Sequence, residues 1–295
     1  MSSLALLAGA GCSIKKMAVN SMSDALSESG KTFASDDDPE FIKQASPFSL
    51  KLIESLLAEN PEHRGLLLAA CRGFTQYAYA FIQEDADELE TRDLQASLAL
   101  KKRAKRMYFR ARNYGLRGLE LDYPGFEKSL RGNPKAAVQK ASAKDVPFLF
   151  WTAASWGSAI SVSKDDPETI ADQLIVEALI DRAMELDDKF DNGAVYSFLI
   201  SYEAARQGAK GDFAARSKKY YEQAMELSRG RLAGPPVAYA ETVCVIKQNK
   251  QEFESLLNKA LTIDPDADPD HRLLNLVMQR RARWLLSRTD ELFVE

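Results

Sequence analysis

Gln223-Ala224-Met225-Glu226-Leu227-Ser228 is one of four segments in this chain of 295 residues that share one pattern of side chains. In each, a small residue stands second, an apolar residue third, another apolar residue fifth, and Asp or Ser last. The other three are Arg117-Gly118-Leu119-Glu120-Leu121-Asp122, Arg182-Ala183-Met184-Glu185-Leu186-Asp187 and Lys259-Ala260-Leu261-Thr262-Ile263-Asp264. From small residue to small residue the steps are 65, 41 and 36 positions. Such spacing is typical of stacked helical hairpins, because one pair of helices cannot bury its apolar face alone. The pattern predicts an all-α fold and favours binding over catalysis.

The small residue in these segments has a packing reason. In three of them a bulky apolar residue lies three positions earlier, so that the two share one helix face; the bulky residues are Ile180, Tyr221 and Leu257. The small residue lets a neighbouring helix approach closely. The repeat resembles the tetratricopeptide repeat, a helix-turn-helix unit of about 34 residues, although its steps are longer and irregular. We therefore expect stacked antiparallel helical hairpins in a tetratricopeptide-like scaffold, with an ordinary helical domain as the alternative.

Helix is the expected state for most of the chain from residue 39 onward. Four segments offer a cap, a proline in the first turn and an acidic residue, which together favour a helix start; they are Asp38-Pro39-Glu40, Asn60-Pro61-Glu62, Asp166-Pro167-Glu168 and Asp268-Pro269-Asp270. The expected helices cover about 39–59, 62–88, 91–121, 147–163, 167–187, 191–207, 212–229, 235–247, 250–263 and 269–288. The Gly- and Pro-containing stretch from residue 123 to 147 is expected to be a connector.

Composition and charge describe a chain that can bury a sizeable core. Of its residues 45% are hydrophobic and 28% are charged, which argues against wholesale disorder. The net charge of -4 argues against nucleic acid as the main partner. A basic run over residues 101–117 carries eight positive charges in 17 residues, and acidic residues within 84–90 precede it. We expect this run to form a solvated or mutually paired surface, because a nucleic-acid helix would keep its basic face unopposed.

Residues that could carry catalysis or bind a metal are scarce. The two histidines, His63 and His271, each follow a helix start and precede an arginine, so local position explains them better than chemistry does. Neither lies near a cysteine or a carboxylate pair at metal-ligand spacing. The chain also lacks a Walker A loop, a Gly-x-Gly-x-x-Gly turn and an obvious Ser/His or Cys/His arrangement. We therefore predict no cofactor, no metal site and a non-catalytic role.

The N-terminus carries the second informative pattern. A short apolar run over residues 4–12 closes in small residues before Cys12. This is similar to the end of a bacterial lipoprotein signal, whose cysteine is lipidated and becomes the new N-terminus. No Lys or Arg precedes Cys12, and Gly9 stands where Leu is commonest, so a frayed N-terminus with a buried cysteine is the alternative. The predicted organisation is a shortened signal over residues 1–11, a tether over 12–38 and a single helical-repeat domain over 39–295.

Cys71 and Cys244 both lie in apolar helical stretches. Free cysteines of this kind are usually small core residues. In an oxidising compartment the two could instead form a disulfide, because nothing in the sequence fixes the distance between them.

Four long motifs occur in order along the chain: Arg110-Ala111-Arg112-Asn113-Tyr114-Gly115-Leu116-Arg117, Asp145-Val146-Pro147-Phe148-Leu149-Phe150-Trp151-Thr152-Ala153-Ala154-Ser155-Trp156-Gly157, Leu199-Ile200-Ser201-Tyr202-Glu203 and Gln279-Arg280-Arg281-Ala282-Arg283-Trp284-Leu285-Leu286. Together they resemble the T-component proteins of tripartite ATP-independent periplasmic (TRAP) transporters, over nearly the whole chain from about Cys12 to Phe293. The resemblance implies a periplasmic lipoprotein of tetratricopeptide-like helices that associates with the transporter's solute-binding protein, forms homotrimers and encloses a channel through each protomer. It implies no catalytic residues.

Aromatic residues in these motifs are the first candidates to line such a channel. The segment 148–160 mixes large aromatic side chains with small ones, which either pack helices tightly or leave room for an apolar ligand. Trp151 and Trp156 are about 140° apart around a helix, so they cannot share a narrow stripe. The ligand-channel candidates are Trp151, Trp156, Tyr202, Arg281 and Trp284.

Arg281 is the most pointed of these candidates, because apolar residues lie one turn before it and one turn after it. A buried guanidinium must be paired or hydrogen-bonded. We expect a structural pair with a carboxylate, for which Glu203 is a candidate. The alternative is that Arg281 meets the carboxylate of a transported acid, since bidentate recognition suits that anion.

Two functional classes remain open at this point. The first is a lipid-anchored periplasmic component of a TRAP system, which binds the solute-binding protein and holds or passes a small apolar or carboxylated solute. The second is an intracellular helical-repeat adaptor unrelated to transport. If the gene for this chain lies next to the genes for a TRAP solute-binding protein and its membrane subunits, the first class is favoured over the second.

Overall fold

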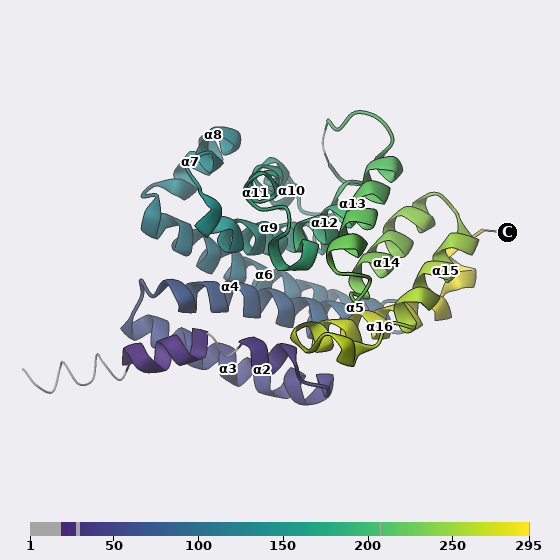
Figure 1. Cartoon of the computed structure of the whole chain (residues 1–295), viewed down its shortest axis with the longest axis horizontal. Coiled ribbons are helices and arrows are strands. Elements are labelled where there is room, and N and C mark those ends of the chain that lie inside the picture. Colours follow the sequence, from purple (N-terminus) through teal and green to yellow (C-terminus); the bar gives the residue numbers. More distant parts are fainter. Residues whose placement is uncertain (1–18, 28–29, 207, 295) are drawn as a thin grey trace, which may run out of the picture.

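Helices account for most of the folded chain (Figure 1). The computed structural model describes residues 19–27, 30–206 and 208–294, and these residues include no strand. A helical stretch at residues 19–27 comes first. The α-helices after it are α2 (Gly30–Ala34), α3 (Pro39–Glu59), α4 (Arg64–Ala78), α5 (Glu84–Leu89), α6 (Leu94–Asp122), α7 (Phe126–Gly132), α8 (Pro134–Val138), α9 (Val146–Ser161), α10 (Pro167–Ala171), α11 (Gln173–Leu186), α12 (Phe190–Tyr202), α13 (Phe213–Leu227), α14 (Gly234–Tyr239), α15 (Lys250–Leu261), α16 (Arg272–Ser287) and α17 (Thr289–Leu292). Shorter turns join them: the π-helical η1 (Tyr79–Gln83) and η3 (Ala240–Cys244), and the 3₁₀-helical η2 (Ala143–Asp145), η4 (Pro265–Ala267) and η5 (Pro269–His271). The expected all-α fold is confirmed.

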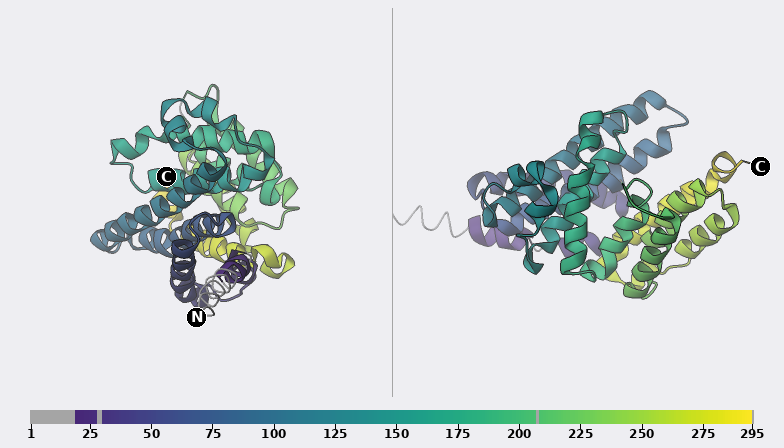
Figure 2. Two further views of the ribbon diagram at one scale, coloured as in Figure 1. Left: turned by 90° about the vertical axis from the view of Figure 1, so that its left-hand side faces the viewer. Right: turned by 90° about the horizontal axis from the view of Figure 1, so that it is seen from above.

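The helices stack in an order that brings the end of the chain back to its beginning. α6 packs against α4 and α9, α9 packs on α11, α12 packs on α13, and α15 packs on α16. α16 then contacts α2 and α3, and Figures 1 and 2 show these helices side by side. At this junction Arg272 donates a hydrogen bond to the backbone carbonyl of Ser35 at 2.9 Å. The stack therefore brings α16, near the end of the chain, against α2 and α3, near its beginning.

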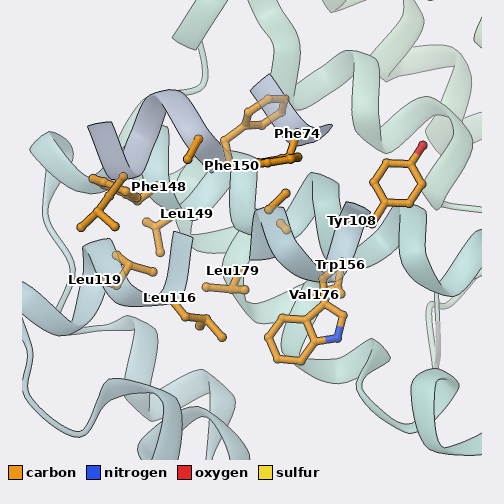
Figure 3. Packing of buried hydrophobic residues seen from close by; sticks show 14 of the residues in the cluster. Phe74, Tyr108, Leu116, Leu119, Phe148, Leu149, Phe150, Trp156, Val176 and Leu179 are labelled. Atoms are coloured by element: carbon orange, nitrogen blue, oxygen red, sulfur yellow. The ribbon is translucent and has the colours of Figure 1, made fainter. Parts of the chain in front are cut away.

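Two hydrophobic clusters fill the interior, and α12 contributes to both. The larger cluster lies mainly among α3, α4, α6, α9 and α11, where Phe148 is almost fully buried (Figure 3). The smaller cluster lies mainly among α12, α14, η3, α15 and α16. On α12, Val195 and Leu199 belong to the larger cluster, whereas Tyr196 and Ile200 belong to the smaller one. α12 therefore joins the two parts of the interior.

The recurring small residues are all buried, as the sequence pattern predicts. Gly118, Ala183, Ala224 and Ala260 lie toward the C-terminal ends of α6, α11, α13 and α15. The requirement is strict at Gly118, because a Cβ atom there would lie 2.0 Å from Cε1 of Phe148. The close crossing of α6 and α9 therefore depends on a residue without a side chain.

Two of the four predicted helix starts are found, and two are shifted; α16 begins at Arg272, after the 3₁₀ turn η5, and Asp268 makes no side-chain cap hydrogen bond. Asp38 caps α3 and Asp166 caps α10, and each side chain accepts hydrogen bonds from two backbone N–H groups of the first turn. At α4 the cap is His63 rather than Asn60, and its Nδ1 accepts a hydrogen bond from the backbone N–H of Leu66 at 3.1 Å. The structure thus gives His63 the local role that its position predicts.

The connector expected at residues 123–147 is wrong, because this stretch folds into α7, α8 and η2. Phe126 and Leu130 lie one turn apart on α7 and are both buried, so this short helix presents an apolar face to the core. Asn133 then caps α8, its side chain accepting a hydrogen bond from the backbone N–H of Ala136 at 3.2 Å. The Gly and Pro residues of this stretch mark helix ends rather than a loop.

The N-terminal segment 12–38, for which a tether is predicted, contains the helical residues 19–27 and α2. Cys12 and the predicted signal over residues 1–11 lie outside the described residues. Within the described part of the chain, no helix combines the length and the apolar character that crossing a membrane requires.

Cys71 and Cys244 are both free and buried. Burial raises the pKa of each thiol to about 12, so both stay protonated at neutral pH. They are small core residues, and the disulfide that the sequence left open is not formed.

Part of the basic run on α6 is matched by acidic residues from other elements. The ion pairs are Lys101–Glu90 at 2.9 Å, Lys105–Asp166 at 2.5 Å and Arg110–Glu54 at 3.3 Å. The expected mutual pairing is therefore confirmed for these three cations.

Candidate functional site

The five predicted channel residues lie in different surroundings and do not line one common surface. Trp156 and Tyr202 are held at the start of α11. Trp151 lies nearer the beginning of α9, beside α4. Arg281 and Trp284 lie one turn apart on α16. Burial and hydrogen bonding separate packing residues from residues that a ligand could reach.

Trp156 and Tyr202 are fixed by contacts within the chain. Trp156 is fully buried, and its Nε1 donates a hydrogen bond to Asp172 at 3.2 Å. Tyr202 stacks on Phe198 with 5.2 Å between ring centroids, and its hydroxyl donates to the backbone carbonyl of Gln173 at 3.2 Å. These contacts agree with the alternative in which the aromatic residues pack helices together.

Trp151 is only partly buried, as Tyr202 is. Its edge meets the Phe150 ring with 5.1 Å between centroids, and the guanidinium of Arg72 lies 5.7 Å from the centroid of the Trp151 ring. Among the described residues, the buried Nε of Arg72 has no hydrogen-bond partner. An aromatic face and a guanidinium with spare donor capacity therefore lie next to each other between α4 and α9. The sequence analysis missed Arg72, since nothing about its position distinguishes it from a surface arginine.

Arg281 is buried, with 6% of its surface exposed, and all three of its guanidinium nitrogens contact carboxylates. Nη1 donates to Asp87 at 2.9 Å and to Glu84 at 3.4 Å, whereas Nε donates to Glu241 at 3.2 Å and Nη2 bonds the same carboxylate. The expected structural pair is therefore present, but Glu203 as its partner is wrong. Glu203 lies at the end of α12 and pairs instead with Arg206 and Arg216.

Two neighbouring arginines of α16 grip α5 in the same way. Arg281 contacts Asp87 at 2.9 Å and Glu84 at 3.4 Å. Arg280 contacts Asp85 at 2.9 Å and Glu88 at 2.8 Å. Acidic residues three apart lie on one helix face, so α5 presents two interleaved carboxylate pairs to two adjacent guanidinium groups. This arrangement joins segments about 195 positions apart in the sequence. The acidic spacing was visible in the sequence, but nothing there linked it to residues 280 and 281.

Both π-helical turns lie at the carboxylates around Arg281. η1 ends directly before Glu84, and η3 contains Glu241. A π-helical turn holds an extra residue, which rotates the side chains after it relative to a regular α-helix. Burial raises the pKa of Glu84 to about 7 and also raises that of Asp87, in opposition to the attraction of Arg281. The Trp284 ring lies between Arg281 and Arg288, whose guanidinium groups are 4.4 and 4.9 Å from its centroid.

The turn into α12 is held by the second histidine. Asp191, Asn192 and Gly193 have φ angles of 47°, 54° and 88°, a left-handed conformation that these three residue types adopt most readily. The carboxylate of Asp191 lies 3.3 Å from Nε2 of His271, and Asp268 lies 3.3 Å from Nδ1. His271 therefore fastens an unusual turn to the start of α16.

The described residues contain no group of three or more His, Cys, Asp and Glu side chains that could hold a metal ion.

We expect the stabilisation by His271 to depend on pH. Its pKa is raised above the ordinary value of 6.5, chiefly by the hydrogen bond with Asp191. The contribution of the imidazolium is therefore fully present below about pH 6.5 and is lost as the pH rises through the raised pKa. The difference in free energy of unfolding between the wild type and His271→Gln should shrink between about pH 6 and about pH 8.5, as urea unfolding measures. Titration of Glu84 is common to both proteins and cancels, so a difference that stays constant would contradict the prediction.

Comparison with known proteins shows which family this chain is similar to. The sequence matches the family described as TRAP transporter T-component over residues 35–293. A protein of Treponema pallidum (strain Nichols), described only as uncharacterized, is 30% identical over 310 aligned positions, which cover 97% of this chain and 94% of that protein. The family match includes every helix from α3 to α16 and all five channel candidates.

Proposed function

The chain belongs to the TRAP transporter T-component family, and on that premise we propose that it is a non-catalytic accessory component that binds the system's periplasmic solute-binding protein. The observation that carries this proposal is the family match over residues 35–293, which spans nearly all of the described helices. The burial and pairing of Arg281 also support a scaffold rather than a reaction centre, because its guanidinium donors are directed to carboxylates of the chain itself. We further propose that the protein forms homotrimers, with light scattering in solution as the measurement.

Association with the solute-binding protein is tested by co-purification at native expression. The probe is the solute-binding protein of the TRAP system encoded beside this chain, with the solute-binding protein of another TRAP system as the control. Selective recovery of the cognate protein, with or without solute, is the expected result. Failure to recover it in solution and on membranes would remove the transport role and leave the helical fold unaffected.

We propose that a lipid on Cys12 anchors the protein to the periplasmic side of a membrane. We expect Cys12→Ser to move most of the protein from the membrane fraction to the soluble periplasmic fraction. The physical reason is that a single acyl chain binds a bilayer only marginally, so firm anchoring requires the multiple chains that a lipidated cysteine carries. Fractionation followed by immunoblotting measures the change. Tight membrane retention of Cys12→Ser would contradict the anchor.

For solute contact we propose Trp151 together with Arg72. Trp151 is partly exposed and offers an aromatic face, and the Arg72 guanidinium beside it can donate to a carboxylate. The probe is cis-parinaric acid, a fluorescent fatty acid with both chemical features. Arg72→Gln and Trp151→Leu should each weaken its binding several-fold, whereas Trp284→Leu should not. Equal binding by all four proteins would exclude this contact.

A further inference from the structure

One face of α6 carries more positive charge than the carboxylates of the fold neutralise, although Arg110 pairs with Glu54. Along the surface where α6 passes α3, two adjoining hollows of about 490 and 120 Å³ share Arg110 in their walls, and together they form what we name the α6 groove. Its charged lining consists of Lys51, Glu54, Arg103, Arg106, Arg110 and Arg117. Five cations therefore face one carboxylate, a local charge of +4 in a chain whose net charge is -4. The four arginines recur at steps of three, four and seven, so they share one helix face.

Aromatic rings hold the arginines of the groove in place while leaving donors exposed. The guanidinium of Arg110 lies 5.2 Å from the Phe74 ring centroid, and that of Arg117 lies 5.4 Å from the Tyr114 ring centroid. Arg117 also donates to the backbone carbonyl of Pro61 at 2.9 Å. Arginine stacked in this way loses little further freedom when it binds a carboxylate, because its planar fork is already oriented.

Glu54 does not neutralise the groove. Its Oε1 accepts a hydrogen bond from the Tyr114 hydroxyl at 2.8 Å and lies 3.3 Å from Nε of Arg110, and its Oε2 meets Lys51 at 3.0 Å. The pKa of Glu54 is lowered by these partners, although burial opposes them. One ionised carboxylate is therefore shared among several donors. Arg106 makes no ion pair with any residue in the described part of the chain.

The contrast with α16 indicates that the unmatched charge has an external use. There, each of two adjacent arginines is matched by two carboxylates of α5. Along the α6 groove the positively charged side chains repel one another instead. Binding of an acidic segment relieves this repulsion, which is why arginine clusters often recognise such segments. From Arg106 to Arg117 the helix rises about 16 Å, which an extended peptide of about five residues spans.

We propose that the α6 groove docks an acidic segment of a protein partner. Asp or Glu side chains of this segment pair with Arg106, Arg110 and Arg117, and an apolar side chain lies over the half-buried rings of Phe109 and Tyr114. This proposal rests on the function proposed above, so the partner is the solute-binding protein. An anionic bilayer is the competing occupant, and the test below distinguishes it from a protein partner.

The test compares two charge reversals of equal size in the full chain. Arg106→Glu/Arg110→Glu alters the groove, and Lys218→Glu/Lys219→Glu alters two exposed lysines of α13. Binding to the purified solute-binding protein is measured by surface plasmon resonance at low and high salt. We expect the groove variant to raise Kd about tenfold or more and to flatten the salt dependence, with the α13 variant close to wild type. A milder variant, Arg106→Gln/Arg117→Gln, keeps the Arg110–Glu54 pair and serves if the charge reversal harms folding. It should show a smaller rise in Kd and a smaller change in salt dependence.

The outcomes separate this inference from the proposed function. If wild type binds and both groove variants bind equally well, the groove is not the docking surface while the transport role stands. If wild type does not bind the solute-binding protein at all, the proposed function and the inference fail together. Vesicles of phosphatidylcholine with phosphatidylglycerol provide the third arm. Loss of vesicle binding by the groove variants, with partner binding unchanged, would make the groove a membrane contact and overturn the proposal.

Discussion

Arg281→Leu is expected to lower the free energy of unfolding by about 3–5 kcal/mol. The side chains of Glu84, Asp87 and Glu241 surround the guanidinium, so removing it leaves negative charges without a counterion in a partly dry site. Burial already raises the pKa of Glu84 to about 7. Without Arg281 these groups can lose their charge only by binding protons, so the destabilisation should be larger at about pH 8 than at about pH 5. Urea unfolding followed by far-ultraviolet circular dichroism at the two pH values measures both effects.

Glu84→Gln is the matched control, because it removes one of the carboxylates around a single guanidinium. The folded pKa of Glu84 lies above its ordinary value of 4.5, so ionising this group costs stability as the pH rises between about 4.5 and 7. Glutamine does not incur that cost, and Glu84→Gln should be neutral or slightly stabilising at about pH 8. Unchanged stability of Arg281→Leu combined with weaker solute capture would instead make Arg281 a ligand contact.

Gly118→Ala is expected to destabilise the protein by about 1–3 kcal/mol, although alanine is the better helix former. The added Cβ would lie 2.0 Å from the Phe148 ring, which is almost fully buried and has no space to turn aside. α6 and α9 would have to separate to accept one methyl group. Thermal unfolding of the variant measures the loss.

Gly132→Ala is the same substitution at a position where the added methyl group meets no atom within 4 Å. It should raise stability by up to about 1 kcal/mol, as the helix propensity alone predicts. Gly118→Ala combined with Phe148→Leu should recover part of the loss, because a smaller side chain relieves the overlap. Equal effects of the two alanine substitutions would show that the helices at Gly118 are free to move apart.

Local chemistry made much of the fold predictable from sequence. Asp38 and Asp166 cap helices because their carboxylates accept from backbone N–H groups a few residues away, a relation that the sequence shows directly. The small residues near the ends of α6, α13 and α15 were recognisable because the same pattern recurs. α7 was missed because Gly125 and Pro124 resemble loop residues, whereas they stand just before a short helix.

Long-range relations could not be derived in this way. The carboxylate partners of Arg281 come from α5 and η3, and no spacing rule links residues so far apart in the sequence. Glu203 was a reasonable partner by charge, but the position of α12 turns it toward Arg216 of α13. The accessibility of Trp151 and the burial of Trp156 likewise depend on which helices cover α9.

The return of α16 to α2 and α3 has a consequence for how the chain is made. In an open repeat array each unit needs only its neighbour, so early units can complete their folding while later ones are still being synthesised. In this chain the hydrogen bond from Arg272 to Ser35 joins positions 237 apart, and the part of α2 and α3 that α16 contacts stays exposed until nearly the whole polypeptide exists. Contacts over such separations slow folding. Such a delay would suit export as an unfolded polypeptide, and a chain truncated before residue 272 would leave the part of α2 and α3 that α16 contacts permanently exposed.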